Sequence, residues 1–291
     1  MAITNSGQAG PPADRSHMER LITAWANEEN VAGGRVRRSI MVAVVMSMLY
    51  SVEPHGNVAS FVVKGGSAMD LRFGWGARTS KDLDSVFRGN LDDAVGEVRT
   101  AVEREWQGFT GTVVGVETIE IPGLRIKPLR CQVKLLFKGR AFGTLPMEIS
   151  APEGKSLDEV DVVSVRPFQQ VRLSPISEVD CLQVPYQIAQ KLHACTDPLD
   201  GTQENVRVQD IADLILLETL VPDDGLASVR QACVDIFEGR DNHQWPPTIR
   251  AGASWSALWE RLVDNGEAPF EDLADAITAV QGFVRGIDET G

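Results

Sequence analysis

The segment FVVKGGSAMDLRFGWGARTSKDLDSVF, residues 61–87, constrains the fold more than any other part of the chain. Its first residues are β-branched and aromatic, so a buried strand is expected over residues 60–64. Two glycines follow, and they indicate a turn into a short helix over residues 67–73. A second strand is expected around residues 83–87. This alternation favours a sheet that carries helices on its faces.

The rest of the chain divides into a mixed part and a helical part, with a boundary near residue 180. In the mixed part we expect helices at 16–30, 35–52 and 91–106, and strands at 112–120, 129–138 and 143–150. Weaker signals over 155–182 indicate further strands or an extended connection. The helical part is predicted at 184–196, 205–220, 225–240, 254–265 and 269–287. We therefore predict an α+β protein with a disordered leader (1–15), an α/β domain (16–180) and a C-terminal helical domain (181–291).

Composition excludes several classes of protein. The chain of 291 residues has a formal net charge of −13, which disfavours non-specific attraction to nucleic acid, so any polyanion site must be a local patch. No apolar run approaches the roughly 18 residues of a membrane span, and the first residues lack the features of a signal peptide. The four cysteines are scattered, which indicates buried thiols rather than zinc ligands or disulfides. We expect a cytoplasmic protein with no membrane partner.

A strand that ends in Gly65-Gly66 and runs into a helix at Ser67 can form a seat for an anion. The first N–H groups of a helix have no partner within it, and glycine lets a phosphate approach the backbone closely. A double glycine is also common in plain turns. The pattern therefore needs support from other residues.

Asp82 and Asp84 give that support, because residues two apart on a strand project from the same face. Two carboxylates so close repel each other unless a cation lies between them, and hard oxygen ligands suit Mg²⁺. An isolated pair of this kind is also compatible with an exposed edge strand. Glu148, in the apolar run LPMEIS, is either a third ligand or a residue on the exposed face. Three carboxylates with Mg²⁺ would suit in-line nucleotidyl transfer.

Two groups of basic residues are further candidates for binding phosphate. From Ile121 to Met147 there is no acidic residue but six basic ones, namely Arg125, Lys127, Arg130, Lys134, Lys138 and Arg140. This segment is either a phosphate-binding hairpin or a solvated face that happens to be basic. The second group, Arg35, Arg37 and Arg38, stands at a predicted helix start. Positive charge there opposes the helix dipole and weakly favours an external role.

Four blocks together carry a resemblance to a known family: KGGSAMDLRFG, ARTSKDLD, IAQKLHACT and RVQDIADL, which span roughly residues 60–220. In this order they resemble the AbiEii/AbiGii-type nucleotidyltransferase toxins, including the MenT-like group, of the DNA polymerase β-like nucleotidyltransferase superfamily. The resemblance implies an enzyme with a minimal nucleotidyltransferase core, built on a mixed sheet and followed by a helical bundle. It also implies NTP as cosubstrate, Mg²⁺ or Mn²⁺ as cofactor, and a cognate antitoxin protein as partner.

The resemblance assigns roles to individual residues. Gly66 and Ser67 match the pair that holds the triphosphate, with Lys64 and Gly65 beside them as further candidates. Asp82 and Asp84 match the metal-binding pair, and Ser80 matches a serine that can bind a phosphate. Lys191 matches a lysine that faces the nucleotide phosphates, and Asp210 and Asp213 match the carboxylates of the next helix. One of these carboxylates is expected to orient Lys191 and the other to contact ribose or RNA.

The expected function is transfer of a nucleoside monophosphate to RNA, with the 3′ acceptor end of tRNA as target, which would block translation. Two alternatives remain open, namely transfer to a protein or small molecule, and a degenerate protein that only binds nucleotide or a partner. The basic segment favours RNA, and the intact set of Ser67, Asp82, Asp84 and Lys191 argues against degeneracy. The sequence leaves open which NTP is used, because base readout depends on the shape of a pocket.

Overall fold

The structure is a computed structural model that describes residues 10–52, 59–120, 126–199 and 204–291. The expected leader lies outside these ranges up to residue 9, and so does Arg125 of the basic segment. Asp14 already caps the first helix, because its carboxylate accepts a hydrogen bond of 2.8 Å from the His17 N–H.

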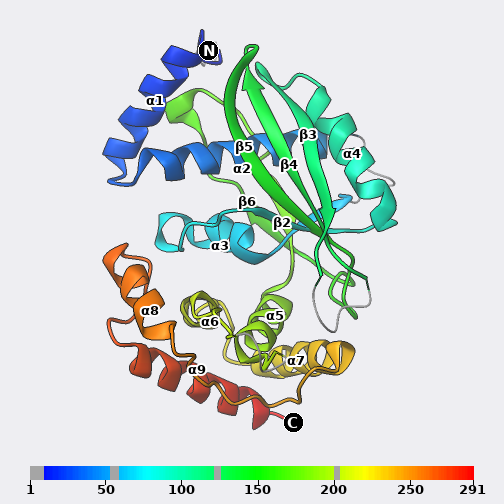
Figure 1. Cartoon of the computed structure of the whole chain (residues 1–291), viewed down its shortest axis with the longest axis vertical. Helices are drawn as coiled ribbons and strands as arrows, with labels where there is room; N and C mark the ends of the chain where they lie inside the picture. Colours follow the sequence, from blue (N-terminus) through cyan, green and yellow to red (C-terminus); the bar gives the residue numbers. More distant parts are fainter. Residues whose placement is uncertain (1–9, 53–58, 121–125, 200–203) are drawn as a thin grey trace, which may run out of the picture.

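Within the described residues, the strands form one seven-stranded sheet in the order β3-β4-β5-β2-β1-β7-β6 (Figure 1). The strands are β1 (Phe61–Val63), β2 (Leu83–Phe87), β3 (Phe109–Thr118), β4 (Leu129–Phe137), β5 (Arg140–Ser150), β6 (Asp161–Ser164) and β7 (Glu178–Cys181). β2 runs parallel to β5, and β1 runs parallel to β7, whereas the other neighbours are antiparallel. The predicted mixed sheet is therefore confirmed.

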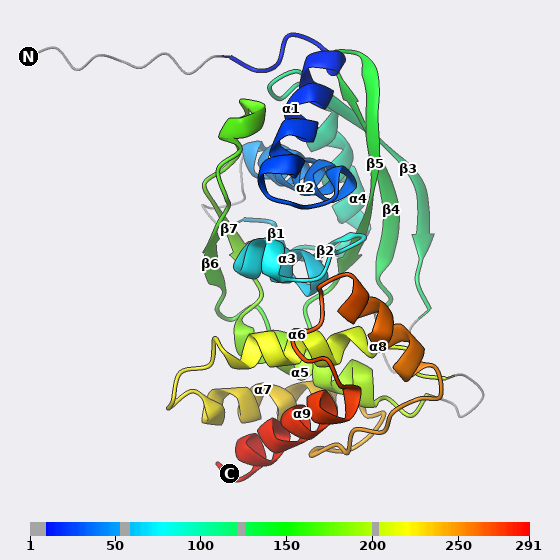
Figure 2. The same cartoon turned by 90° about the vertical axis from the view of Figure 1, so that its left-hand side faces the viewer.

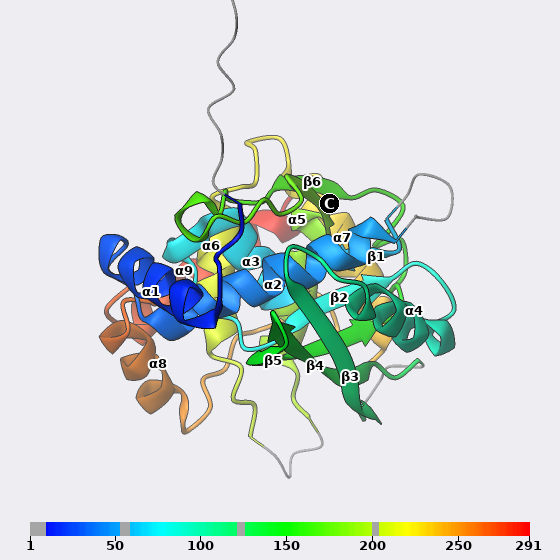
Figure 3. The same cartoon turned by 90° about the horizontal axis from the view of Figure 1, so that it is seen from above.

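Helices of the N-terminal part cover one face of this sheet. They are α1 (Arg15–Glu28), α2 (Gly33–Ser51) and α4 (Leu91–Glu103), and Figure 3 shows α2 crossing between the other two. α2 is buried almost all round from Ile40 to Leu49, as expected of a helix that is apolar on every side. None of the helices in the described ranges is long and apolar enough to cross a membrane.

The C-terminal part is helical, as predicted, and forms a separate layer beneath the sheet (Figure 2). Its helices are α5 (Val184–Thr196), α6 (Gln209–Glu218), α7 (Leu226–Arg240), α8 (Trp255–Asp264) and α9 (Leu273–Asp288). α5 packs against both α6 and α7, and Figure 1 shows it between them.

Two hydrophobic clusters hold these parts together. One joins α1, α2 and α4 to the sheet, and the other fills the helical part. Met69 and Ala77 belong to the second cluster although they come from the α/β part. Met69 lies in α3 (Gly65–Phe73), and Ala77 follows the short 3₁₀ turn η2 (Gly74–Gly76) that comes after it. A second 3₁₀ turn, η3 (Gln169–Val171), contacts α1. The glycine-opened helix is therefore held between the sheet and the helical part.

Candidate active site

The double glycine lets the start of α3 pass directly over Asp84. The Lys64 N–H donates to the Asp84 carbonyl at 3.0 Å, and the Gly66 N–H donates to Asp84 Oδ2 at 3.1 Å. Gly65 has a φ of +57°, and a Cβ at this position would lie 2.4 Å from Asp84 Oδ2. Both the backbone angle and the close approach therefore require glycine here.

Two serine hydroxyls fix the backbone of Asp82. Ser67 Oγ donates to the Asp82 carbonyl at 2.8 Å, and Ser80 Oγ donates to the same oxygen at 2.9 Å. Both serines are buried. The structure thus places Ser67 and Ser80, which we expected on phosphate, where they position the first aspartate of the pair.

Asp84 and Glu148 are neighbours across the sheet. They are paired residues of the parallel strands β2 and β5. On the other side of β5, Glu148 is paired with Arg130 of the antiparallel strand β4. Arg130 contacts the Glu148 carboxylate at 3.4 Å. Burial, and next the charge of Glu148, raise the pKa of Asp84 to about 6, while Lys64 and the Gly66 N–H oppose the rise.

The Asp84–Glu148 pair has the chemistry of a site for a divalent cation. A cation would offset the repulsion between Asp84 and Glu148, and a pair of oxygen donors suits Mg²⁺. Within the described residues, no group of three or more acidic, histidine or cysteine side chains is arranged closely enough to hold a metal. The chemistry of the pair fits, and the metal-binding roles of Asp82, Asp84 and Glu148 remain predictions.

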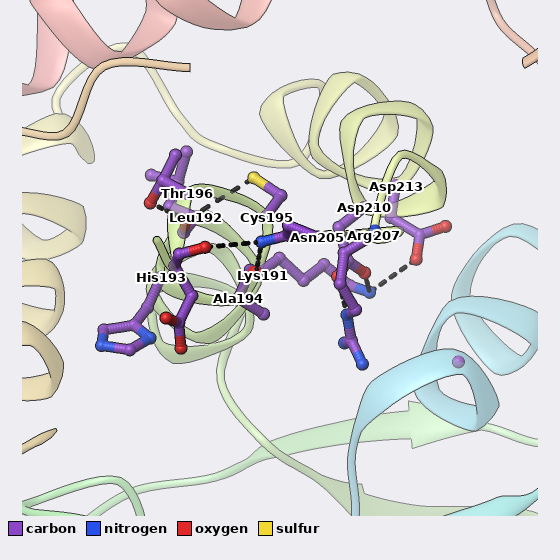
Figure 4. Close-up of polar contacts among 12 residues, drawn as sticks. Lys191, Leu192, His193, Ala194, Cys195, Thr196, Asn205, Arg207, Asp210 and Asp213 are labelled. Atoms are coloured by element: carbon purple, nitrogen blue, oxygen red, sulfur yellow. Dashed lines mark hydrogen bonds and ion pairs between the residues drawn. The ribbon is translucent and has the colours of Figure 1, made fainter. Parts of the chain in front are cut away.

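A second polar cluster lies between α5 and α6. The Lys191 ammonium contacts Asp210 at 3.0 Å and Asp213 at 2.5 Å, and Figure 4 shows it between the two carboxylates. All three side chains are buried. Burial opposes ionisation of Lys191, but the two carboxylates raise its pKa, so it is held as a cation. Both aspartates therefore orient the lysine, whereas we had expected only one to do so.

Comparison with known proteins places this geometry in a family. The family model described as "Nucleotidyl transferase AbiEii toxin, Type IV TA system" matches residues 48–279. The chain belongs to this family. It is a nucleotidyltransferase toxin of a type IV toxin-antitoxin system, and such a system implies a nucleotide substrate and an antitoxin partner. No curated protein matches the chain.

Two solved structures are similar to this chain. MenT4, a nucleotidyltransferase toxin from Mycobacterium tuberculosis H37Rv, matches with a TM-score of 0.52 and 16% identity, over 94% of this chain and 99% of its own. A putative nucleotidyltransferase from H. pylori matches with a TM-score of 0.49 and 19% identity, over 87% of this chain and 94% of its own. The α+β class with a nucleotidyltransferase core is confirmed by the first of these.

Two arginines that the sequence analysis missed complete the second cluster of this toxin. Arg78 contacts Asp213 with both Nε and Nη2, at 2.9–3.2 Å, and Arg207 Nε donates to Asp210 Oδ2 at 2.8 Å. The Arg207 side chain is 51% exposed, whereas that of Lys191 is 7% exposed. Asp210 is the main cause of the raised pKa of Arg207, and Asp84 contributes, so its guanidinium lies within electrostatic reach of both clusters. The sequence did contain one indication of these arginines. Asp210 and Asp213 carry two negative charges and Lys191 only one positive charge, so another cation was to be expected near them.

The α2 arginines have an internal role, which corrects the external one favoured above. Arg35 donates to the carbonyls of Gly74 and Ala77, and Arg38 donates to that of Lys81. Arg37 pairs with Glu19 of α1. Arg35 and Arg38 therefore fix the loop that leads to Asp82, and positive charge at this helix start is tolerated because these two side chains bind backbone carbonyls and Arg37 binds a carboxylate.

The basic hairpin is less uniform in space than in sequence. Lys127 pairs with Glu120, and Arg130 lies 3.8 Å from Glu117, so acidic residues outside the segment offset part of its charge. Lys138 contacts the Ala13 carbonyl, and Arg140 is eight residues from Glu148 on β5, which corresponds to ~27 Å along a strand. Arg130 and Lys134 are the members that lie on the same strand face leading to Glu148.

Proposed function

We propose that this toxin transfers a nucleoside monophosphate from an NTP to the 3′ acceptor end of tRNA, with Mg²⁺ as cofactor, and thereby blocks translation. The observation that carries the proposal is the pairing of Asp84 with Glu148 directly beneath the start of α3. Acidic ligands and an anion seat are both needed where a triphosphate is cleaved. Here a single hydrogen bond, from the Gly66 N–H to Asp84, joins the start of α3 to the acidic pair.

The chain's own residues would divide the work in the following way. The first turn of α3 would receive the triphosphate with N–H groups other than that of Gly66, which already donates to Asp84, and that of Ala68, which donates to the Lys64 carbonyl. The exposed Arg207 would neutralise part of the triphosphate charge. Lys191 would act on the triphosphate without being exposed at the surface of the site, because it is buried and bound to two carboxylates. Mg²⁺ would be held by Asp82, Asp84 and Glu148, where it would supply charge neutralisation at the phosphate and a lower pKa of the attacking hydroxyl.

RNA is the acceptor favoured by the charge distribution. A chain with a net charge of −13 can hold a polyanion only where cations gather, and Arg130 and Lys134 lie on the strand face that leads to Glu148. This arrangement would guide phosphates along β4 to the carboxylates. A small acceptor would need no such path.

The test is an incubation of the pure toxin with each α-³²P-labelled NTP, Mg²⁺ and total RNA, followed by gel electrophoresis. We expect label in a band of tRNA size, and none when the RNA has first been oxidised with periodate, which destroys the 3′ diol. Asp84→Asn should abolish labelling, and the matched surface variant Asp223→Asn should not. Label on protein would favour another acceptor, and no label with any NTP would refute the proposal.

A further inference from the structure

A cavity of about 210 Å³ lies between the end of β5 and helix α7, outside the residues discussed so far. Its wall includes Ile126, Ser150, Pro152, Asp235, Gly239 and Arg240. Pockets that enclose whole drug-sized ligands measure roughly 300–1,000 Å³, so this one suits a smaller group such as a nucleobase.

The cavity adjoins the carboxylates of the active site. Ser150 follows Glu148 by two residues on β5, and the two residues pair with Val86 and Asp84 of β2. Residues two apart on a strand share a face and lie ~7 Å apart along it, so Ser150 of the cavity wall stands on the same face of β5 as Glu148. The Lys64 charge acts on both places, because it opposes the raised pKa of Asp84 and contributes to the lowered pKa of Glu153 in the cavity wall, where burial opposes and Arg240 supports the shift.

The position distinguishes the cavity from the triphosphate side of the site. Lys191, Arg207 and their aspartates join α5 to the start of α6, whereas the cavity is bordered by α7. Figure 1 shows α6 and α7 on opposite sides of α5. Asp84 and Glu148 lie on the sheet above. A group bound in the cavity would thus approach the carboxylates from the side opposite the cationic cluster, which is where an acceptor must lie for in-line displacement.

The wall combines apolar surface with rigid polar groups. Arg240 clamps Glu153 at 2.7 and 3.0 Å, and Gln190 donates to the same carboxylate at 2.9 Å. Asp235 accepts hydrogen bonds from the Tyr186 hydroxyl at 2.8 Å and from the Lys155 N–H at 2.9 Å, both at Oδ2. A carboxylate has further acceptor sites at its second oxygen, and carboxylates accept hydrogen bonds from exocyclic amino groups of bases.

We propose that this cavity binds the 3′-terminal nucleoside of the acceptor RNA, with Asp235 accepting from the exocyclic amino group of its base. This inference rests on the proposed transfer to RNA. The step forms a bond between the terminal hydroxyl oxygen and the α-phosphorus, and breaks the bond from that phosphorus to the bridging oxygen of the leaving pyrophosphate. The hydroxyl proton is released to water.

Gly239 offers a way to fill the cavity without disturbing the fold. It lies within α7, and among the described atoms none comes within 4 Å of the position that its Cβ would take. Replacement by Ala, Leu and Trp should therefore place side chains of rising volume in the cavity at no cost to the helix, since glycine is a poor helix former. Gly96 of α4 is a matched control, because it is also helical and its Cβ would also meet open space.

The experiment measures labelling of RNA and binding of NTP for this series. We expect the KM for RNA to rise at least tenfold for Gly239→Leu and further for Gly239→Trp, with the affinity for NTP and the thermal midpoint close to wild type. Gly96→Leu should leave all three unchanged. We also expect RNA ending in adenosine or cytidine to be used at least tenfold better than RNA ending in uridine, which lacks an exocyclic amino group.

The outcomes separate the two proposals. If wild-type toxin labels RNA and Gly239→Leu keeps a normal KM for RNA, the cavity is not the acceptor site and the proposed function survives. Equal use of the three RNA ends would overturn the role of Asp235. If wild-type toxin labels a protein or nothing at all, both proposals fail.

Discussion

Removing the Asp213 carboxylate should destabilise the fold more than any change at the exposed rim of the site. Asp213 is buried, contacts Lys191 at 2.5 Å, and accepts from two nitrogens of Arg78. In the cluster, three cationic side chains face two carboxylates, which leaves one surplus positive charge. Asp213→Ala raises that surplus to two and leaves Arg78 without its buried partner.

The magnitude follows from the burial of the partners. Breaking a buried ion pair by removing one member costs about 3–5 kcal/mol, because the other charge stays desolvated. Arg78 is 19% exposed and can regain some water, so we expect about 3 kcal/mol. For domains of 150–250 residues this corresponds to a fall of roughly 6–12 °C in the thermal midpoint.

Urea denaturation followed by circular dichroism measures this loss. Asp223→Ala, at an exposed loop position, is the control and should change the free energy of unfolding by less than about 0.5 kcal/mol. The double variant Arg78→Met with Asp213→Leu should recover at least half of the loss, since apolar replacement of a buried pair is often neutral. A loss below about 1 kcal/mol for Asp213→Ala would refute the reasoning that the cluster is desolvated.

Three further predictions follow from contacts in the site and its surroundings. Asp84→Asn should raise the free energy of unfolding at pH 7.5 by ~1–2 kcal/mol without Mg²⁺. The reason is that a pKa of about 6 means that the folded protein disfavours the ionised Asp84 carboxylate. Lower stability of the variant in urea denaturation would contradict this. Burial, and next the charges of Arg240 and His243, lower the pKa of His193 to about 3, so the unfolded chain binds more protons between pH 3 and 6.5. Stability should therefore fall as pH falls through this window, with a slope of at most about 1.4 kcal/mol per pH unit from this group, and His193→Gln should flatten the slope. Neutralising Arg130 and Lys134 to Gln should reduce the salt slope of RNA binding by about 1.4–1.8, whereas the same change at Lys138 and Arg140, far from Glu148, should not; equal effects of the two pairs would count against the path along β4.

Much of the fold could be predicted from local patterns. The strand, glycine turn and helix at 61–73, the mixed sheet and the five C-terminal helices all follow from residue spacing and turn residues. Strand ends were less accurate, because β3 begins at Phe109 and β5 at Arg140, three residues before the expected positions in each case. The ring of Phe109 packs against Phe137 and Phe142, and this contact between strands extends the hairpin beyond its local signals.

The site could be predicted only where its residues are close in sequence or match a family motif. Ser67 and Ser80 were found, but their binding to the Asp82 carbonyl depends on how α3 crosses β2. Arg78 was missed because its partner Asp213 is 135 residues away, in the other part of the chain. The spacing of residues in a sequence shows which side chains share a face of one helix or strand. It does not show which helix or loop packs against that face, and the Arg78–Asp213 pair depends on such packing.

The loop from Gly74 to Asp82 explains why both parts of the chain are needed for one site. Arg35 and Arg38 hold it from α2, Arg78 ties it to α6, and the Thr79 N–H donates to Glu267, between α8 and α9, at 2.9 Å. Because the loop ends at Asp82, any shift of the helical part against the sheet is transmitted to the first carboxylate. In the proposed function, the helical part would therefore act on the chemistry through backbone position as well as through Lys191 and Arg207, and this gives a physical reason for a family match that extends to residue 279, well beyond the sheet.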